Sequence, residues 1–91
     1  MTIRVLVADD QAMIRGALAG LLDLESDIEV VAQAADGTQA LEELARLASA
    51  DAPAHASAPV DVAIIDVEMP RMDGITATQA IRSRFPGVRV L

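Results

Sequence analysis

The segment at residues 60–74, VDVAIIDVEMPRMDG, is the part of the chain from which the fold is inferred. Residues 60–65 are a nearly unbroken apolar run, which is typical of a strand buried on both faces of a parallel sheet. The run ends at Asp66, and Pro70 and Gly74 then prevent the strand from continuing. Because chemistry in open parallel sheets gathers at the carboxyl ends of strands, the Asp66 carboxylate is the first candidate functional group.

Three further segments have the composition of strands. Residues 3–8, IRVLVA, are β-branched and apolar, and they lead directly into Asp9 and Asp10. Residues 28–34, IEVVAQA, contain polar side chains that favour an edge position, and residues 88–91, VRVL, begin a fourth strand. The sequence therefore predicts two strands, the first and the third, that end in acidic residues.

Helical periodicity separates these strands and predicts helices at residues 12–25 and 74–85, and between them a helix that follows a turn at Asp36 and Gly37 and runs to about residue 48. Asp36 with Gln39 has the capping-box spacing, and Asp73 is a candidate cap for the last helix. The predicted core-facing side chains are Ile14, Leu18, Leu21 and Leu22 in the first helix, Leu41, Leu44, Ala45 and Ala48 in the second, and Ile75, Thr78, Ile81 and Phe85 in the third. The first helix has a second apolar seam, which we expect another segment to cover: Met13, Ala17, Gly20 and Leu24.

The alternation of strands and helices predicts an α/β fold, a doubly wound parallel sheet of the flavodoxin-like class, in a single domain over residues 1–91. In that class the strand order begins 2-1-3, so the first and third strands are neighbours. Residues 49–59, SADAPAHASAP, are low in complexity and are interpreted as a flexible surface loop with no packed role. His55 lies there, and a solvated side chain is the expected state for this histidine.

Composition excludes several classes of protein. The net charge is −7 and all seven basic residues are arginines, so this segment is not expected to bind nucleic acid itself. There is no cysteine for a disulfide or a thiolate metal site. No secretory signal is visible and no apolar run reaches the roughly 18 residues of a membrane span. A cytoplasmic protein is therefore expected.

The carboxylates of Asp9, Asp10 and Asp66 are expected to lie together, because they follow neighbouring parallel strands. Without a cation, three such groups would repel one another. Mg²⁺ is the expected ligand, since it is typically held by a few carboxylates with water and phosphate oxygens in the remaining positions. An Asp beside this ion can also attack a phosphoryl group and hold it as an acyl phosphate. The simpler alternative is that Asp9 or Asp10 only caps the first helix.

The segments VLVADD and DVEMPRMDG, with proline four residues and glycine eight residues after the aspartate, resemble the receiver domain of bacterial two-component response regulators. The resemblance covers nearly the whole chain. It implies that Asp66 accepts a phosphoryl group from the phosphohistidine of a sensor histidine kinase. It also implies that Asp9 and Asp10 hold Mg²⁺ together with Asp66 and the backbone carbonyl of Glu68, and that Pro70 and Gly74 shape the loop beside the phosphorylation site.

More narrowly, ADDQAMIRGALAGLL followed by DVEMP is similar to the NarL-type branch, and within it to regulators of fatty-acid desaturase genes. Members of that branch carry a C-terminal helix-turn-helix. DNA binding is accordingly expected only of a longer parent protein, through a domain that this sequence does not include.

The sequence departs from the family pattern in two respects. Receivers have a Ser or Thr just past the fourth strand and a Lys at the end of the fifth, whereas this chain ends within the fourth strand and contains no lysine. Strand five and the last helices are also absent, which suggests a fragment. We therefore expect the fourth strand and the first helix to pair with a second copy of the chain, by edge addition or domain swapping. The 49–59 loop is the second departure, since it is longer than is usual in receivers.

Two other functions are compatible with parts of the sequence. A phosphatase of the haloacid-dehalogenase type also uses a strand-end Asp with Mg²⁺, but it typically needs a second Asp two residues later, where this chain has Glu68. An interaction module that never carries phosphate is the other alternative, because the Lys and the Ser/Thr are missing. The favoured hypothesis is a phosphoacceptor that is not an enzyme in its own right and at most loses its phosphate slowly.

Overall fold

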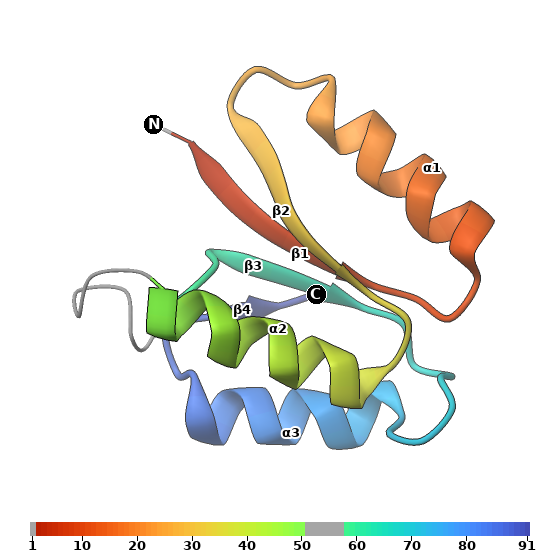
Figure 1. Ribbon diagram of the computed structural model, residues 1–91, viewed down its shortest axis with the longest axis vertical. Helices are drawn as coiled ribbons and strands as arrows, with labels where there is room; N and C mark the ends of the chain where they lie inside the picture. Colours follow the sequence, from red (N-terminus) through yellow and green to blue (C-terminus); the bar gives the residue numbers. More distant parts are fainter. Residues whose placement is uncertain (1, 51–57) are drawn as a thin grey trace.

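The computed structural model describes residues 2–50 and 58–91. Strands and helices alternate in the predicted order (Figure 1). The elements are β1 (Ile3–Ala8), α1 (Ala12–Asp23), β2 (Ile28–Ala34), α2 (Gly37–Ala50), β3 (Val62–Ile65), α3 (Gly74–Arg84) and β4 (Arg89–Val90). No helix in this described part of the chain is long and apolar enough to cross a bilayer.

The four strands form one parallel sheet in the order β2-β1-β3-β4. Helix α1 lies on one side of the sheet, and α2 and α3 lie together on the other (Figure 1). The predicted flavodoxin-like, doubly wound fold is therefore confirmed, with β2 at one edge. Because the strands are parallel, β1 and β3 both finish at the same end of the sheet, the end formed by the carboxyl termini of the strands.

The largest core lies between the sheet and the α2–α3 layer. It contains Leu6 of β1, Leu44 of α2 and Ile81 of α3, each with 0% exposure, and Phe85 closes one end. Burial of such a side chain contributes about 1.5–3 kcal/mol. The predicted inward positions of α2 are confirmed, with Leu41 and Leu44 buried and Ala45 and Ala48 packed against the cluster. This layer fixes the positions of β3 and α3, which flank Asp66.

The predicted orientation of α1 about its own axis is wrong in part. Leu18 and Leu22 are half-buried as expected and Ala19 is buried, but Ile14 and Leu21 are 52% and 65% exposed. The face of α1 toward the sheet is therefore centred on Leu18, Ala19 and Leu22, which leaves Ile14 and Leu21 outside it. The second seam of the helix is also exposed, from Met13 at 87% to Leu24 at 80%. In the described residues α1 therefore carries a broad uncovered apolar face.

Helix α3 also differs from the prediction at one position. Ile75 is 60% exposed, whereas Ala77, Ile81 and Phe85 form the buried stripe at a spacing of four residues. Thr78 is half-buried, and its hydroxyl donates a 2.7 Å hydrogen bond to the Gly74 carbonyl. The outward position of Ile75 leaves its side chain at the rim of the candidate site described below.

The predicted loop at residues 49–59 is wrong at both of its ends. Helix α2 continues to Ala50, so Ser49 and Ala50 are helical. Pro59 is fully buried and Val60 is 1% exposed, so the end of the segment packs into the core. The remainder of the predicted loop, including His55, lies outside the described residues.

Candidate functional site

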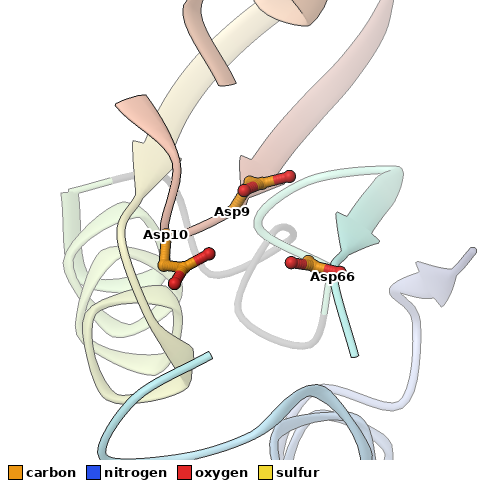
Figure 2. Close-up of side chains that lie close together, drawn as sticks. All are labelled: Asp9, Asp10 and Asp66. Atoms are coloured by element: carbon orange, nitrogen blue, oxygen red, sulfur yellow. The ribbon is translucent and has the colours of Figure 1, made fainter. Parts of the chain in front are cut away.

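The three predicted aspartates meet at the carboxyl ends of the central strands β1 and β3. Ala8 of β1 is in register with Ile65 of β3, so the next residues along the two strands, Asp9 and Asp66, are neighbours. The Asp66 amide donates a 3.0 Å hydrogen bond to the Ala8 carbonyl, which fixes this register beyond the strand ends. One carboxylate oxygen from each of Asp9, Asp10 and Asp66 lies within 4.8 Å of the other two, and Figure 2 shows the side chains converging.

Solvent can reach the acidic cluster. Asp9 and Asp66 are half-buried and Asp10 is exposed. A surface cavity of about 810 Å³ adjoins them, and its lining includes Asp10, Asp66 and the loop residues from Val67 to Pro70. Such a cavity has space for a hydrated cation and a phosphoryl group.

The acids do not act simply as caps of α1. The N-cap position of α1 is Gln11, whose side chain makes no capping hydrogen bond. Asp9 Oδ1 accepts a 2.9 Å hydrogen bond from the Gln11 amide, while the Arg15 guanidinium donates a 2.7 Å hydrogen bond to the Asp9 carbonyl. Arg15 therefore brings a positive charge beside the cluster and holds the β1–α1 turn in place.

The geometry fits a small divalent cation. Oxygen ligands of Mg²⁺ lie about 2.0–2.1 Å from the ion, so two ligands of one ion are at most roughly 4.2 Å apart. Small side-chain rotations bring oxygens that lie within 4.8 Å of one another into that range. The donor set, carboxylates beside an open cavity, also suits an ion that retains several waters.

The loop after Asp66 is tied to the start of α3. The Gly74 amide donates a 2.8 Å hydrogen bond to the Val67 carbonyl. Asp73 caps α3 as predicted, and the Thr76 backbone amide that donates to its carboxylate lowers the pKa of Asp73. The Glu68 side chain is exposed and its backbone belongs to the loop that lines the cavity.

A second contact holds this loop to α2, and the sequence did not reveal it. The Arg71 guanidinium pairs with the carboxylate of Asp36, whose side chain is fully buried. The capping-box prediction is confirmed in one half, because the Gln39 amide donates to Asp36 Oδ1 at 2.8 Å, while the Gln39 side chain accepts from Ala35. Burial raises the pKa of Asp36, but the Gln39 amide and Arg71 outweigh it and hold that pKa below its ordinary value.

The chain matches the family model of the response regulator receiver domain over residues 5–91. The response regulator protein VraR of Staphylococcus aureus is 38% identical over 91 residues, which are 100% of this chain and 38% of VraR. A protein-glutamate methylesterase/protein-glutamine glutaminase of Paramagnetospirillum magneticum is also 38% identical, over 99% of this chain and 21% of that protein. The chain thus spans well under half the length of these curated relatives.

Solved structures agree with this match. The response regulator domain of Thermotoga maritima CheB has a TM-score of 0.82 at 36% identity, over 99% of this chain and 58% of that one. A CheX–CheY–BeF₃–Mg²⁺ complex from Borrelia burgdorferi gives a TM-score of 0.77 at 27% identity, over 97% of this chain and 58% of that one. The narrower NarL-type expectation is only loosely supported. The signal receiver domain of NarL from Mycobacterium tuberculosis is 36% identical with a TM-score of 0.78, over 98% of this chain and 63% of that one, so it is no more similar than the CheB domain.

The strand order, the three acids at the ends of β1 and β3, and a family match over residues 5–91 agree on one assignment. The chain belongs to the receiver domains of response regulators.

Proposed function

We propose that Asp66 is the phosphoacceptor of this receiver and that a sensor histidine kinase is the donor. The observation that carries the proposal is the convergence of the Asp9, Asp10 and Asp66 carboxylates beside an open cavity. An Asp66 carboxylate oxygen attacks phosphorus, the P–N bond of the phosphohistidine breaks, and the imidazole leaves with the bonding electron pair. The product is an aspartyl phosphate at the edge of the sheet.

Asp9, Asp10, Asp66 and the Glu68 backbone carbonyl are the proposed ligands of Mg²⁺. The bound ion would neutralise charge on the phosphoryl oxygens. The chain's own residues supply the acceptor oxygen, and the turn held by Arg15 orients Asp9 toward it. Mg²⁺ is the main counter-charge that the proposal offers to a phosphoryl group at Asp66.

We expect phosphorylation to depend strongly on Mg²⁺. The chain, incubated with acetyl phosphate and Mg²⁺, should gain one phosphoryl group by intact mass. Chelation with EDTA should slow this gain by at least about a hundredfold, because a metal ion supplies several kcal/mol of charge stabilisation. The same measurement should be repeated on the full-length protein that the gene encodes. A full-length protein that gains no phosphoryl group would favour the interaction module instead.

The broader role follows from the phosphoacceptor proposal. The domain acts as a switch in the cytoplasm that is phosphorylated but does not itself turn over a substrate, and its aspartyl phosphate hydrolyses slowly. Any DNA contact belongs to a C-terminal domain of a longer protein, since this segment has a net charge of −7. Turnover of a generic phosphomonoester would contradict this role and revive the phosphatase alternative.

We propose that the exposed apolar face of α1 binds a second copy of the chain. Met13, Leu21 and Leu24 are 87%, 65% and 80% exposed, which is unfavourable for large apolar side chains in water. A two-fold axis would bury the same patch of both copies against itself. The edge of β4 that faces away from β3 offers backbone groups for a further contact.

We expect the chain to form a dimer that Leu21→Glu weakens. A charge on the buried patch should raise the dissociation constant at least about tenfold, since an unpaired charge is costly to bury. Size-exclusion chromatography with light scattering across a concentration series measures this change. Ile75→Glu is the control, because it adds the same charge to the exposed surface of α3. A well-folded monomer at high concentration would count against the proposal.

A further inference from the structure

The loop between Asp66 and α3 contains a strained turn. Arg71 has a φ of 63°, a left-handed backbone conformation that residues other than glycine rarely adopt. The Met72 amide donates a 2.6 Å hydrogen bond to the Pro70 carbonyl, so the three residues form a γ-turn. A γ-turn with positive φ at its centre is the rare, strained form. Such a conformation persists only where surrounding contacts maintain it.

Those contacts come from Asp36, just before α2, and from Gly37, its first residue, more than thirty residues earlier in the sequence. The Arg71 guanidinium pairs with the fully buried Asp36 carboxylate, and the Gly37 amide donates a 3.1 Å hydrogen bond to the Met72 carbonyl. The two backbones approach closely, since a Cβ on Gly37 would lie 2.7 Å from the Met72 carbonyl oxygen. An ion pair and a backbone hydrogen bond therefore clamp the strained turn to α2.

The clamped turn continues directly into the wall of the phosphoacceptor cavity. Val67, Glu68, Met69 and Pro70 line that cavity, whereas Arg71 does not. The far side of the loop is fixed to α3 by the hydrogen bond from Gly74 to Val67. The Glu68 carbonyl thus lies in a short segment anchored on both sides, and Arg71 supplies one of the anchors.

We propose that Arg71 and Asp36 are positioning residues for the phosphoacceptor site, which orient the Glu68 backbone through the strained turn without touching the phosphoryl group. This inference rests on the proposed function of Asp66. Arg71 is paired with Asp36 and is not offered as a ligand of the phosphoryl group. Loss of the ion pair lets the turn relax and moves the carbonyl away from its place at the cavity.

The test is Arg71→Met, since methionine removes the ion pair but, unlike glycine, keeps the strain of the positive φ. The Mg²⁺ concentration for half-maximal phosphorylation by acetyl phosphate should rise about tenfold. Substitution of residues that orient metal ligands lowers metal affinity by roughly 10- to 100-fold, and we expect the lower value. In the metal-free chain, hydrogen exchange at the Gly37 and Gly74 amides should quicken relative to the amides of β1. Arg71→Lys, which keeps the charge, should restore both readouts in part.

Arg46→Ala is the matched control, because it also removes an arginine–carboxylate ion pair. Arg46 pairs with Glu43 at 2.7 Å on an exposed surface of α2. It should leave both readouts unchanged. Unchanged exchange and an unchanged Mg²⁺ requirement in Arg71→Met would overturn the proposal. A uniform rise in exchange across β1 and α2 would also overturn it, because that indicates general destabilisation. If the unaltered chain is not phosphorylated at all, the proposed function fails, while the exchange measurement still decides whether the clamp holds the loop.

Discussion

Asp66→Asn is expected to abolish phosphoryl transfer to the chain. The amide keeps the size of the side chain but removes the nucleophilic carboxylate and one of three charges whose oxygens lie within 4.8 Å of one another. Neither Asp9 nor Asp10 should replace it, because the proposal assigns both to the cation. Intact mass after incubation with acetyl phosphate and Mg²⁺ should show no gain.

The same substitution should change stability with opposite signs in the two metal states. Without Mg²⁺, removal of a like charge relieves repulsion of about 1 kcal/mol per pair at roughly 4 Å in a water-like dielectric, and more where the carboxylates are half-buried. With Mg²⁺ at about 100 times its dissociation constant, the unaltered chain gains about 2.7 kcal/mol, and Asp66→Asn should lose most of that gain. Thermal unfolding with and without Mg²⁺ measures both effects.

Asp27→Asn is a suitable control for Asp66→Asn, since it makes the same chemical change at an exposed acid before β2, outside the acidic cluster. It should leave phosphorylation and the Mg²⁺ response unchanged. A mass gain in Asp66→Asn equal to that of the unaltered chain would show that another residue accepts the phosphoryl group.

Periodicity predicted the parallel sheet, and the strand order of the flavodoxin-like class then predicted the meeting of the acids. Apolar runs that end in Asp9 and Asp66 specify both strands and their exits, and parallel pairing then places the two exits together. The orientation of α1 was less predictable. The helix has apolar side chains on two adjoining seams, and the buried face is centred on Ala19, which belongs to neither seam. Hydrophobic spacing carries no information about which of these faces lies against the sheet.

The pairing of Arg71 with Asp36 was missed for a different reason. It joins two loops that are far apart in sequence, and neither residue belongs to a periodic pattern. The local part of the arrangement, the Asp36 cap of α2, was visible from its spacing to Gln39. A charged residue directly after Pro70 gave no signal of a partner, because that partner becomes a neighbour only when α2 and α3 pack together.

Gly74→Ala is expected to be strongly destabilising. A Cβ at this position would lie 2.1 Å from the Asp66 carbonyl oxygen and 2.8 Å from the Val67 Cα. Both atoms belong to the backbone, so no side-chain rotation relieves the clash, and α3 must move away from the end of β3. That movement also lengthens the 2.8 Å hydrogen bond from Gly74 to Val67. We expect a loss of about 3 kcal/mol, at the upper end of overpacking effects.

Gly20→Ala separates this steric effect from the general effect of replacing a glycine. Gly20 lies inside α1, and among the described residues no atom outside that helix lies within 4 Å of the position that a Cβ would take. Alanine there should therefore stabilise the chain by about 0.5–1 kcal/mol. Urea unfolding followed by circular dichroism compares the two variants. The same substitution thus has opposite signs at two positions, and a Gly74→Ala protein as stable as the unaltered chain would show that α3 does not pack this closely against the backbone that carries Asp66.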